Sequence, residues 1–125
     1  MKIFRTGEFV TMKDPTPPGE ALNKILTGAD GAKAIEGIFV VRPPIGHGRY
    51  HYHEKREGIF VILSGNASIR IEGKDYPIEA GDIIYVSAGE KHTINNESEK
   101  EIRFMEFYTN PPHEADWVAV PQEEK

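Results

Sequence analysis

Residues 51–86 read HYHEKREGIFVILSGNASIRIEGKDYPIEAGDIIYV, and their apolar residues fall into short runs that turns interrupt. Residues 67–72 alternate apolar and polar side chains, which is typical of a strand with one buried face. The runs 59–63 and 83–86 are apolar at every position, so both faces of these predicted strands need cover. Glycine-containing turns separate the runs. The pattern predicts antiparallel β structure.

The flanking sequence continues the same pattern. We predict further strands at 35–42, 49–53, 92–94 and 102–108, and 12 glycines and 9 prolines divide the chain throughout. Roughly eight to ten short strands with regularly spaced turns indicate a β-sandwich or barrel. Periodicity alone is compatible with a jelly roll, an immunoglobulin-like sandwich or a lipocalin-like barrel.

The two ends of the chain are less regular. Residues 2–12 have weak strand character, and the proline-rich residues 14–19 form a turn or irregular arm. Residues 20–26 are expected to form one short helical turn or part of a loop. The residues from 110 onward are expected to form a tail, in which Trp117 either packs against one end of the barrel or covers a dimer partner, with packing favoured.

The composition excludes or disfavours several classes of function. A chain of 125 residues fits one domain. The absence of cysteine excludes disulfides, thiolate nucleophiles and cysteine-ligated zinc. A net charge of −5 disfavours a nucleic-acid partner, which needs a basic patch. No apolar run is long enough to span a bilayer and the first residues lack a signal-peptide core, so we expect no membrane partner and a cytoplasmic location.

His51 and His53 are the leading candidates for a functional site. Side chains at i and i+2 point to the same face of a strand. A third imidazole from His92 would complete a nitrogen face that leaves metal positions open for water or substrate. We therefore predict a divalent metal site formed by these histidines, with Glu57 as an oxygen ligand. The alternative is that all three histidines are solvated strand and loop residues.

A pocket is predicted beside these histidines. Arg49 shares their strand face and could meet an anionic substrate or pair with a carboxylate of the protein. Phe60 and Ile62 are expected to form the pocket wall, because an apolar pocket with a few polar groups suits a small organic molecule. His47, in a glycine-flanked loop, could act as an acid–base group at the pocket mouth or be solvated.

Two further expectations concern packing around the site. Asn95, Asn96 and Glu106 could supply hydrogen bonds to the ligating residues. The doubly apolar run 59–63, together with Tyr50 and Tyr52, predicts a homodimer.

Two segments resemble the conserved motifs of the cupin superfamily. Residues 46–65, GHGRYHYHEKREGIFVILSG, are similar to the first motif: a glycine, then His-x-His, a glutamate three or four residues later, and a closing glycine. Residues 81–96, GDIIYVSAGEKHTINN, are similar to the second: a glycine, five residues, Pro-x-Gly, two residues, histidine, three residues and asparagine. Ser87 replaces the proline. The resemblance extends over about residues 35–112.

The resemblance implies a double-stranded β-helix, an all-β jelly-roll barrel that is often dimeric. Residues 1–125 would form a single cupin-like domain with its core at about 35–112, an N-terminal arm and a C-terminal tail. The implied ligands are His51, His53, Glu57 and His92. Seven residues, rather than the usual six, separate Glu57 from Gly65. Either a bulge at Gly58 turns Glu57 inward, or alternation leaves a three-histidine site.

The sequence therefore leaves three candidate functions. We predict a metal-binding cupin with a small-molecule pocket, acting as a metal-dependent dioxygenase or isomerase. The first alternative is a noncatalytic protein that binds a sugar or organic acid. The second uses the histidines directly, without a metal. Imidazole ligands are compatible with Zn, Mn, Fe or Ni.

Overall fold

The computed structural model describes residues 1–5, 21–109 and 116–121. These residues form ten strands and one 3-10 turn. In chain order the elements are β1 (Ala21–Leu26), η2 (Gly28–Asp30), β2 (Ile35–Arg42), β3 (His51–Tyr52), β4 (Gly58–Ser64), β5 (Asn66–Ile71), β6 (Lys74–Glu79), β7 (Ile83–Val86), β8 (His92–Asn95), β9 (Ile102–Thr109) and β10 (Val118–Ala119).

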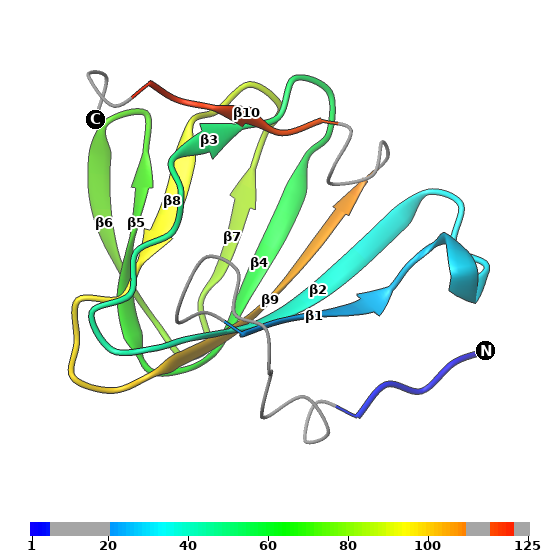
Figure 1. Cartoon of the computed structure of the whole chain (residues 1–125), viewed down its shortest axis with the longest axis horizontal. Coiled ribbons are helices and arrows are strands. Elements are labelled where there is room, and N and C mark those ends of the chain that lie inside the picture. The colour runs from blue at the N-terminus through cyan, green and yellow to red at the C-terminus, as the bar shows by residue number, and fades with distance from the viewer. Residues whose placement is uncertain (6–20, 110–115, 122–125) are drawn as a thin grey trace.

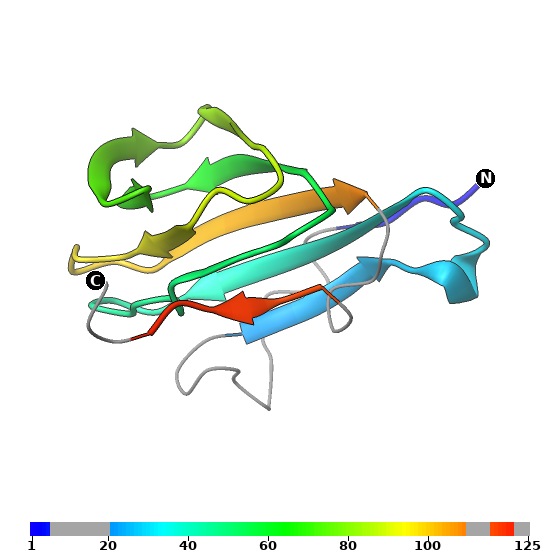
Figure 2. The ribbon, with the colours of Figure 1, turned by 90° about the horizontal axis from the view of Figure 1, so that it is seen from above.

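The strands form two antiparallel five-stranded sheets. The first has the order β1-β2-β9-β4-β7 and the second the order β10-β3-β8-β5-β6. Strands distant in sequence are therefore neighbours, because the chain crosses between the sheets (Figures 1 and 2). This arrangement confirms the predicted all-β class and the double-stranded β-helix. It also decides between the jelly roll and the other β architectures that periodicity allowed.

The main core lies between the two sheets. β9 alternates strictly between buried and half-buried residues along its whole length, as expected for a strand with one inward face. Its buried apolar residues pack with inward side chains of both sheets. This cluster contains Ile38, Val40, Phe60, Ile62, Ile69, Ile78, Val86, Ile94, Ile102, Phe104 and Tyr108.

The outer face of β4 and β7 is largely exposed. Phe60 and Ile62 face the core, whereas Ile59 is 43% exposed. On β7, Ile83 is 68% and Tyr85 57% exposed. The sequence prediction that both faces of these strands are covered is therefore not met by the described residues.

The prediction of a helical turn or loop at residues 20–26 is wrong. Residues 21–26 form β1, which pairs antiparallel with β2 from Ala21 opposite Val41 to Leu26 opposite Gly37. Alanine, leucine and lysine favour helices, but propensity amounts to less than about 1 kcal/mol per residue, and pairing with a neighbouring strand overrides it. Residues 2–5 form no strand, and the rest of the predicted 2–12 strand and the 14–19 arm lie outside the described residues.

Helical structure within the described residues is limited to η2. Thr27 caps it, because its side-chain oxygen accepts a hydrogen bond from the backbone N–H of Ala29 at 3.2 Å and its own N–H donates to Asp30 at 3.1 Å. None of the described segments is a helix that could cross a membrane. The cytoplasmic location stays a prediction.

The turn between β4 and β5 has room only for glycine. Gly65 has φ +90°, and a Cβ added there would lie 2.7 Å from Ile102 Cγ2 and 2.9 Å from the carbonyl oxygen of Glu101. Gly73 offers a matched control, because its φ is +82° but no atom lies within 4 Å of an added Cβ.

We expect Gly65→Ala to lower the free energy of unfolding by about 3 kcal/mol or more, from backbone strain plus the clash. Gly73→Ala should cost about 1 kcal/mol, from strain alone. Urea unfolding followed by circular dichroism measures both. Equal losses in the two variants would contradict the packing described for this turn.

Candidate metal centre

Strand pairing brings three histidines together at one end of the barrel. His51 on β3 lies directly opposite His92, the first residue of β8, and His53 follows β3. The ring centroids of His51 and His92 are 4.4 Å apart, and those of His51 and His53 are 4.8 Å apart. One potential ligand atom from each ring lies within 4.8 Å of the other two. The predicted trio is therefore assembled in space.

A backbone carbonyl orients each imidazole. His51 Nδ1 lies 2.6 Å from the carbonyl oxygen of Arg49, and His92 Nδ1 lies 2.9 Å from that of Glu90. His53 Nδ1 is hydrogen-bonded to the carbonyl oxygen of Asp116. A carbonyl only accepts, so each Nδ1 must carry the hydrogen and each Nε2 has a lone pair. This is how outer residues usually fix the tautomer of metal-ligating histidines.

The environment of His92 fits a metal ligand. Burial lowers its pKa, more strongly than its hydrogen bond to Glu90 raises it, so the ring is neutral at pH 7. Its Nε2 is buried and has no hydrogen-bond partner among the described residues. An unpaired buried acceptor is costly, and coordination would satisfy it. The three residues therefore fit a divalent ion with nitrogen ligands.

The C-terminal segment completes this end of the barrel. β10 pairs with β3, which places Ala119 opposite His51. Trp117 stacks on the His51 ring, with centroids 5.1 Å apart and planes 24° apart. The tryptophan predicted to pack at a barrel end therefore lies against a candidate ligand. Figure 1 shows β10 running beside β3.

Asp116 also fixes the turn after His53. Its carboxylate accepts hydrogen bonds from the backbone N–H groups of Glu54, Lys55 and Arg56 at 2.8, 2.9 and 3.0 Å. Burial raises the pKa of the Asp116 carboxyl, but these hydrogen bonds outweigh burial and the net pKa is lowered. The carboxylate is thus ionised and committed to the turn rather than to a metal.

Arg56 is a site residue that the sequence reasoning missed. Its side chain is 1% exposed, and its Nη2 lies 3.0 Å from Nε2 of His53. The guanidinium carbon lies 3.8 Å above the ring centre of Tyr108, and Nη2 is 3.9 Å from Oε2 of Glu106. In sequence, Arg56 belongs to a charged turn, and such turns are usually solvated. Asp116, 60 residues away, accepts from its backbone N–H, and the side chain contacts residues of distant strands, which local sequence does not show.

Glu106 projects from β9 into the same interior. Burial raises the pKa of its carboxyl to about 7, although the nearby guanidinium groups of Arg56 and Arg42 act in the opposite direction. A Cβ added to Gly58 would lie 3.5 Å from its Oε2. Gly58 therefore faces the barrel interior, where its lack of a side chain leaves space beside Glu106. Glu106 was expected to hydrogen-bond a ligating residue, but its Oε2 lies 3.9 Å from Nη2 of Arg56, which is not one of the predicted ligands.

The structure does not bring Glu57 to the three histidines. Its side chain is exposed and accepts a hydrogen bond at 2.7 Å from the hydroxyl of Tyr85, which lies on the outer face of the sheet. Gly58 takes the inward position, as uninterrupted alternation would require. Of the two ligand sets that the sequence left open, the geometry matches three histidines without Glu57.

The four predicted pocket residues separate into two groups. The Phe60 ring lies 5.9 Å from the His92 ring, so Phe60 borders the site, while Ile62 lies in the main core. Arg49 is exposed and supplies only its carbonyl. His47 is exposed beside Glu97 at 3.7 Å and borders an open hollow of about 250 Å³. Neither Arg49 nor His47 is placed with the three histidines.

The two asparagines are likewise apart from the histidines. Asn96 is buried, and its amide donates to the carbonyl oxygens of Pro43 at 2.9 Å and Lys100 at 2.7 Å, which makes it a turn-stabilising residue. Asn95 borders the same hollow as His47.

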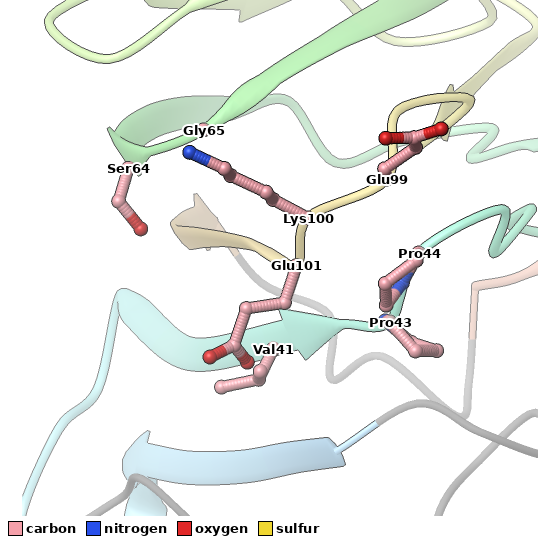
Figure 3. Close-up of a pocket in the computed structure, with 8 residues that line it drawn as sticks. All are labelled: Val41, Pro43, Pro44, Ser64, Gly65, Glu99, Lys100 and Glu101. Atoms are coloured by element: carbon pink, nitrogen blue, oxygen red, sulfur yellow. The ribbon is translucent and has the colours of Figure 1, made fainter.

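A separate groove of about 720 Å³ lies where β4 ends and β9 begins, at the opposite end of these strands from Gly58 and Tyr108 (Figure 3). Its lining mixes prolines with charged side chains. The lining residues are Val41, Pro43, Pro44, Ser64, Gly65, Glu99, Lys100 and Glu101. The groove contains none of the groups of the histidine site.

Fold and site together define a small β-barrel with a cluster of histidines at one end. The sequence profile of the Cupin domain family matches residues 38–108, more than half of the chain. The chain therefore belongs to the cupin family.

Individual relatives indicate the function within this family only in part. An oxalate-binding protein of Thermotoga maritima is 36% identical over 63 residues, which are 50% of this chain and 52% of that protein. The match thus spans about half the length of that relative. The crystal structure of a predicted oxalate decarboxylase from T. maritima is 26% identical and superimposes with a TM-score of 0.75, covering 88% of this chain and 100% of that one.

A structure with different chemistry is equally similar in fold. The polyketide cyclase RemF from Streptomyces resistomycificus superimposes with a TM-score of 0.79 at 20% identity, covering 97% of this chain and 86% of that one. At this identity the likeness concerns the fold alone. Fold does not fix function, so the site must carry the functional argument.

We expect Asp116→Ala to lower the free energy of unfolding at pH 7 by about 2–4 kcal/mol, because three backbone donors lose a charged acceptor. The pKa of Asp116 is lowered on folding, so its contribution exists above the ordinary carboxyl pKa and is lost as pH falls through the lower folded value. The difference from the wild type should therefore shrink in acid. Chemical unfolding at several pH values measures it.

Asp75→Ala is the matched control. Asp75 forms an exposed ion pair with Arg70, at 2.9 Å, and its loss should cost less than about 1 kcal/mol. A loss for Asp116→Ala no larger than that for Asp75→Ala would contradict the role assigned to Asp116.

Proposed function

We propose that this cupin binds a divalent metal ion through His51, His53 and His92 and uses it to hold a small organic acid. The observation that carries the proposal is the common orientation of the three rings. Each Nδ1 is engaged by a carbonyl oxygen, and the buried Nε2 of His92 has no other partner among the described residues. A bound divalent ion would polarise a carbonyl or carboxyl oxygen, or lower the pKa of its water.

The surroundings of the histidines support a small ligand. Phe60 borders the site on the core side and Trp117 covers His51. These rings exclude water, which strengthens electrostatic contacts with a polar ligand. An organic acid is the preferred class because the matched relative is an oxalate-binding protein and a similar structure is a predicted oxalate decarboxylase.

An isomerase is the second candidate function. The observation that favours it is Glu106, a buried carboxyl whose pKa is raised to about 7. A carboxyl with a pKa near the working pH is suited to giving and taking protons. Turnover of a hydroxy- or keto-acid by the metal-loaded protein, lost in Glu106→Gln, would support catalysis. Binding without turnover would leave the noncatalytic function.

The metal site is tested by the double variant His51→Ala/His92→Ala. We expect its affinity for Zn²⁺, Mn²⁺, Fe²⁺ or Ni²⁺ to fall by at least about 100-fold, since two of three ligands are lost. Titration calorimetry of chelator-treated protein measures it. His47→Ala is the control and should bind metal as the wild type does. A double variant that retains wild-type affinity would refute the proposed ligand set.

We also propose that the protein is a homodimer that buries the outer face of β4 and β7. Ile59, Ile83 and Tyr85 are exposed apolar side chains on these two paired strands. A patch of this kind is usually an interaction surface. Tyr50, expected from the sequence to contribute, is instead buried within the chain, and its hydroxyl accepts a hydrogen bond from the N–H of Gly73.

Light scattering coupled to size-exclusion chromatography should give the mass of a dimer for the wild type. Ile83→Lys should give a monomer, because a charge in the interface would be buried without a partner. Tyr76→Lys, at a 47% exposed position on the other sheet, should remain dimeric. A monomeric wild type would contradict the proposal.

A further inference from the structure

We propose that Arg56 is the carboxylate-binding residue of the histidine site, so that the ligand is a small anion that contacts both the metal and the guanidinium. This inference rests on the proposed function, because it concerns the ligand of that same metal site. It names a residue that neither the cupin motifs nor the sequence pattern identifies.

The guanidinium is already buried beside the histidines before any ligand arrives. Its carbon lies 3.8 Å above the ring of Tyr108, and the turn that carries Arg56 is fixed by the carboxylate of Asp116. Stacking on one face leaves the edge of the planar group for hydrogen bonds. A guanidinium edge matches a carboxylate in geometry and can donate two parallel hydrogen bonds.

Metal binding and the present contact of Arg56 exclude each other. Nη2 of Arg56 lies 3.0 Å from Nε2 of His53, and that nitrogen has a single lone pair. The lone pair can accept from Arg56 or bind a metal, but not both. A metal on His53 therefore requires Nη2 to move away, and Oε2 of Glu106, 3.9 Å from Nη2, is an available partner. With Nη2 engaged by Glu106, the guanidinium would still be beside His53 and could donate to an anion bound at the metal.

The charges at the site also call for an anion. A divalent ion and the guanidinium together carry three positive charges, and Glu106, the carboxyl beside Arg56, carries at most one negative charge. The ionised carboxylates of Asp116 and Glu90 also act on His53 and His92, but both are already hydrogen-bonded to other groups, and Glu57 points outward. Unbalanced charge is costly in a buried site. A carboxylate ligand would reduce this cost, whereas a neutral sugar would not.

Two other arginines, Arg42 and Arg49, are less suited to binding a carboxylate at this site. Arg49 is exposed. Arg42 is buried, but it donates to the carbonyl oxygen of Ile94 and its guanidinium lies 5.2 Å over the ring of Phe104. Of these three arginines, Arg56 has a guanidinium hydrogen-bonded to one of the three histidines, whereas Arg49 contacts His51 through its backbone carbonyl.

The test measures metal and anion affinity separately, by titration calorimetry of the full chain. For Arg56→Gln, we expect Zn²⁺ affinity to rise about 3- to 10-fold, because a competing donor and a nearby positive charge are removed. Oxalate affinity of the zinc-loaded protein should fall by at least about 30-fold, because a buried charged partner is lost. Arg56→Lys should lose less oxalate affinity, and Arg49→Gln should match the wild type for both.

The opposite directions of the two changes distinguish anion recognition from a purely structural role, which would weaken both. Unchanged oxalate affinity in zinc-loaded Arg56→Gln would overturn the inference. So would a wild-type protein that holds zinc but binds none of oxalate, malonate and pyruvate. A wild type that binds no divalent metal would instead overturn the proposed function itself.

Discussion

The short strand β3 is held between β8 and β10, and this pairing places the groups of the candidate site. Pairing with β8 sets His51 opposite His92, and pairing with β10 brings Asp116 and Trp117 to His53 and His51. Only two residues of β3 take part in the sheet, so the strand has little stability of its own. The histidine cluster is therefore a property of the assembled second sheet and not of the His-x-His segment alone.

Imidazole is neutral when it binds a metal, and a charged group in direct contact with one of the three histidines is the cation Arg56. This combination differs from a site in which a glutamate shares the coordination. Gly58 takes the inward position next to Glu106, while Arg56 enters from the preceding turn. Coordination by neutral ligands leaves the positive charge of a divalent ion undiminished, which favours an anionic ligand over a neutral one.

Local patterns made much of the fold predictable. The alternation at residues 67–72 and the glycine turns correspond to β5 and the hairpin to β6, and the i, i+2 spacing placed His51 and His53 on one face. The sequence left open whether a bulge turns Glu57 inward or alternation places Gly58 there, and Glu57, predicted as an oxygen ligand, instead bonds Tyr85 on the outer face.

Long-range contacts explain what the sequence did not reveal. β1 pairs with β2, and the turn that carries the buried Arg56 is bound by the carboxylate of Asp116. Neither contact can be predicted from the neighbouring residues in the sequence. The short strand β10 lies in a segment that was expected to be a tail. The apolar runs in β4 and β7 indicated that both faces of these strands are buried, but not which part of the protein or partner buries the outer face.

The most direct test of the metal site is an anomalous-difference map from crystals grown with Zn²⁺. We predict a peak bonded to Nε2 of His51, His53 and His92 at about 2.0–2.1 Å, with no bond to Glu57. A map with no peak within bonding distance of these nitrogens, or with Glu57 as a ligand, would contradict the account.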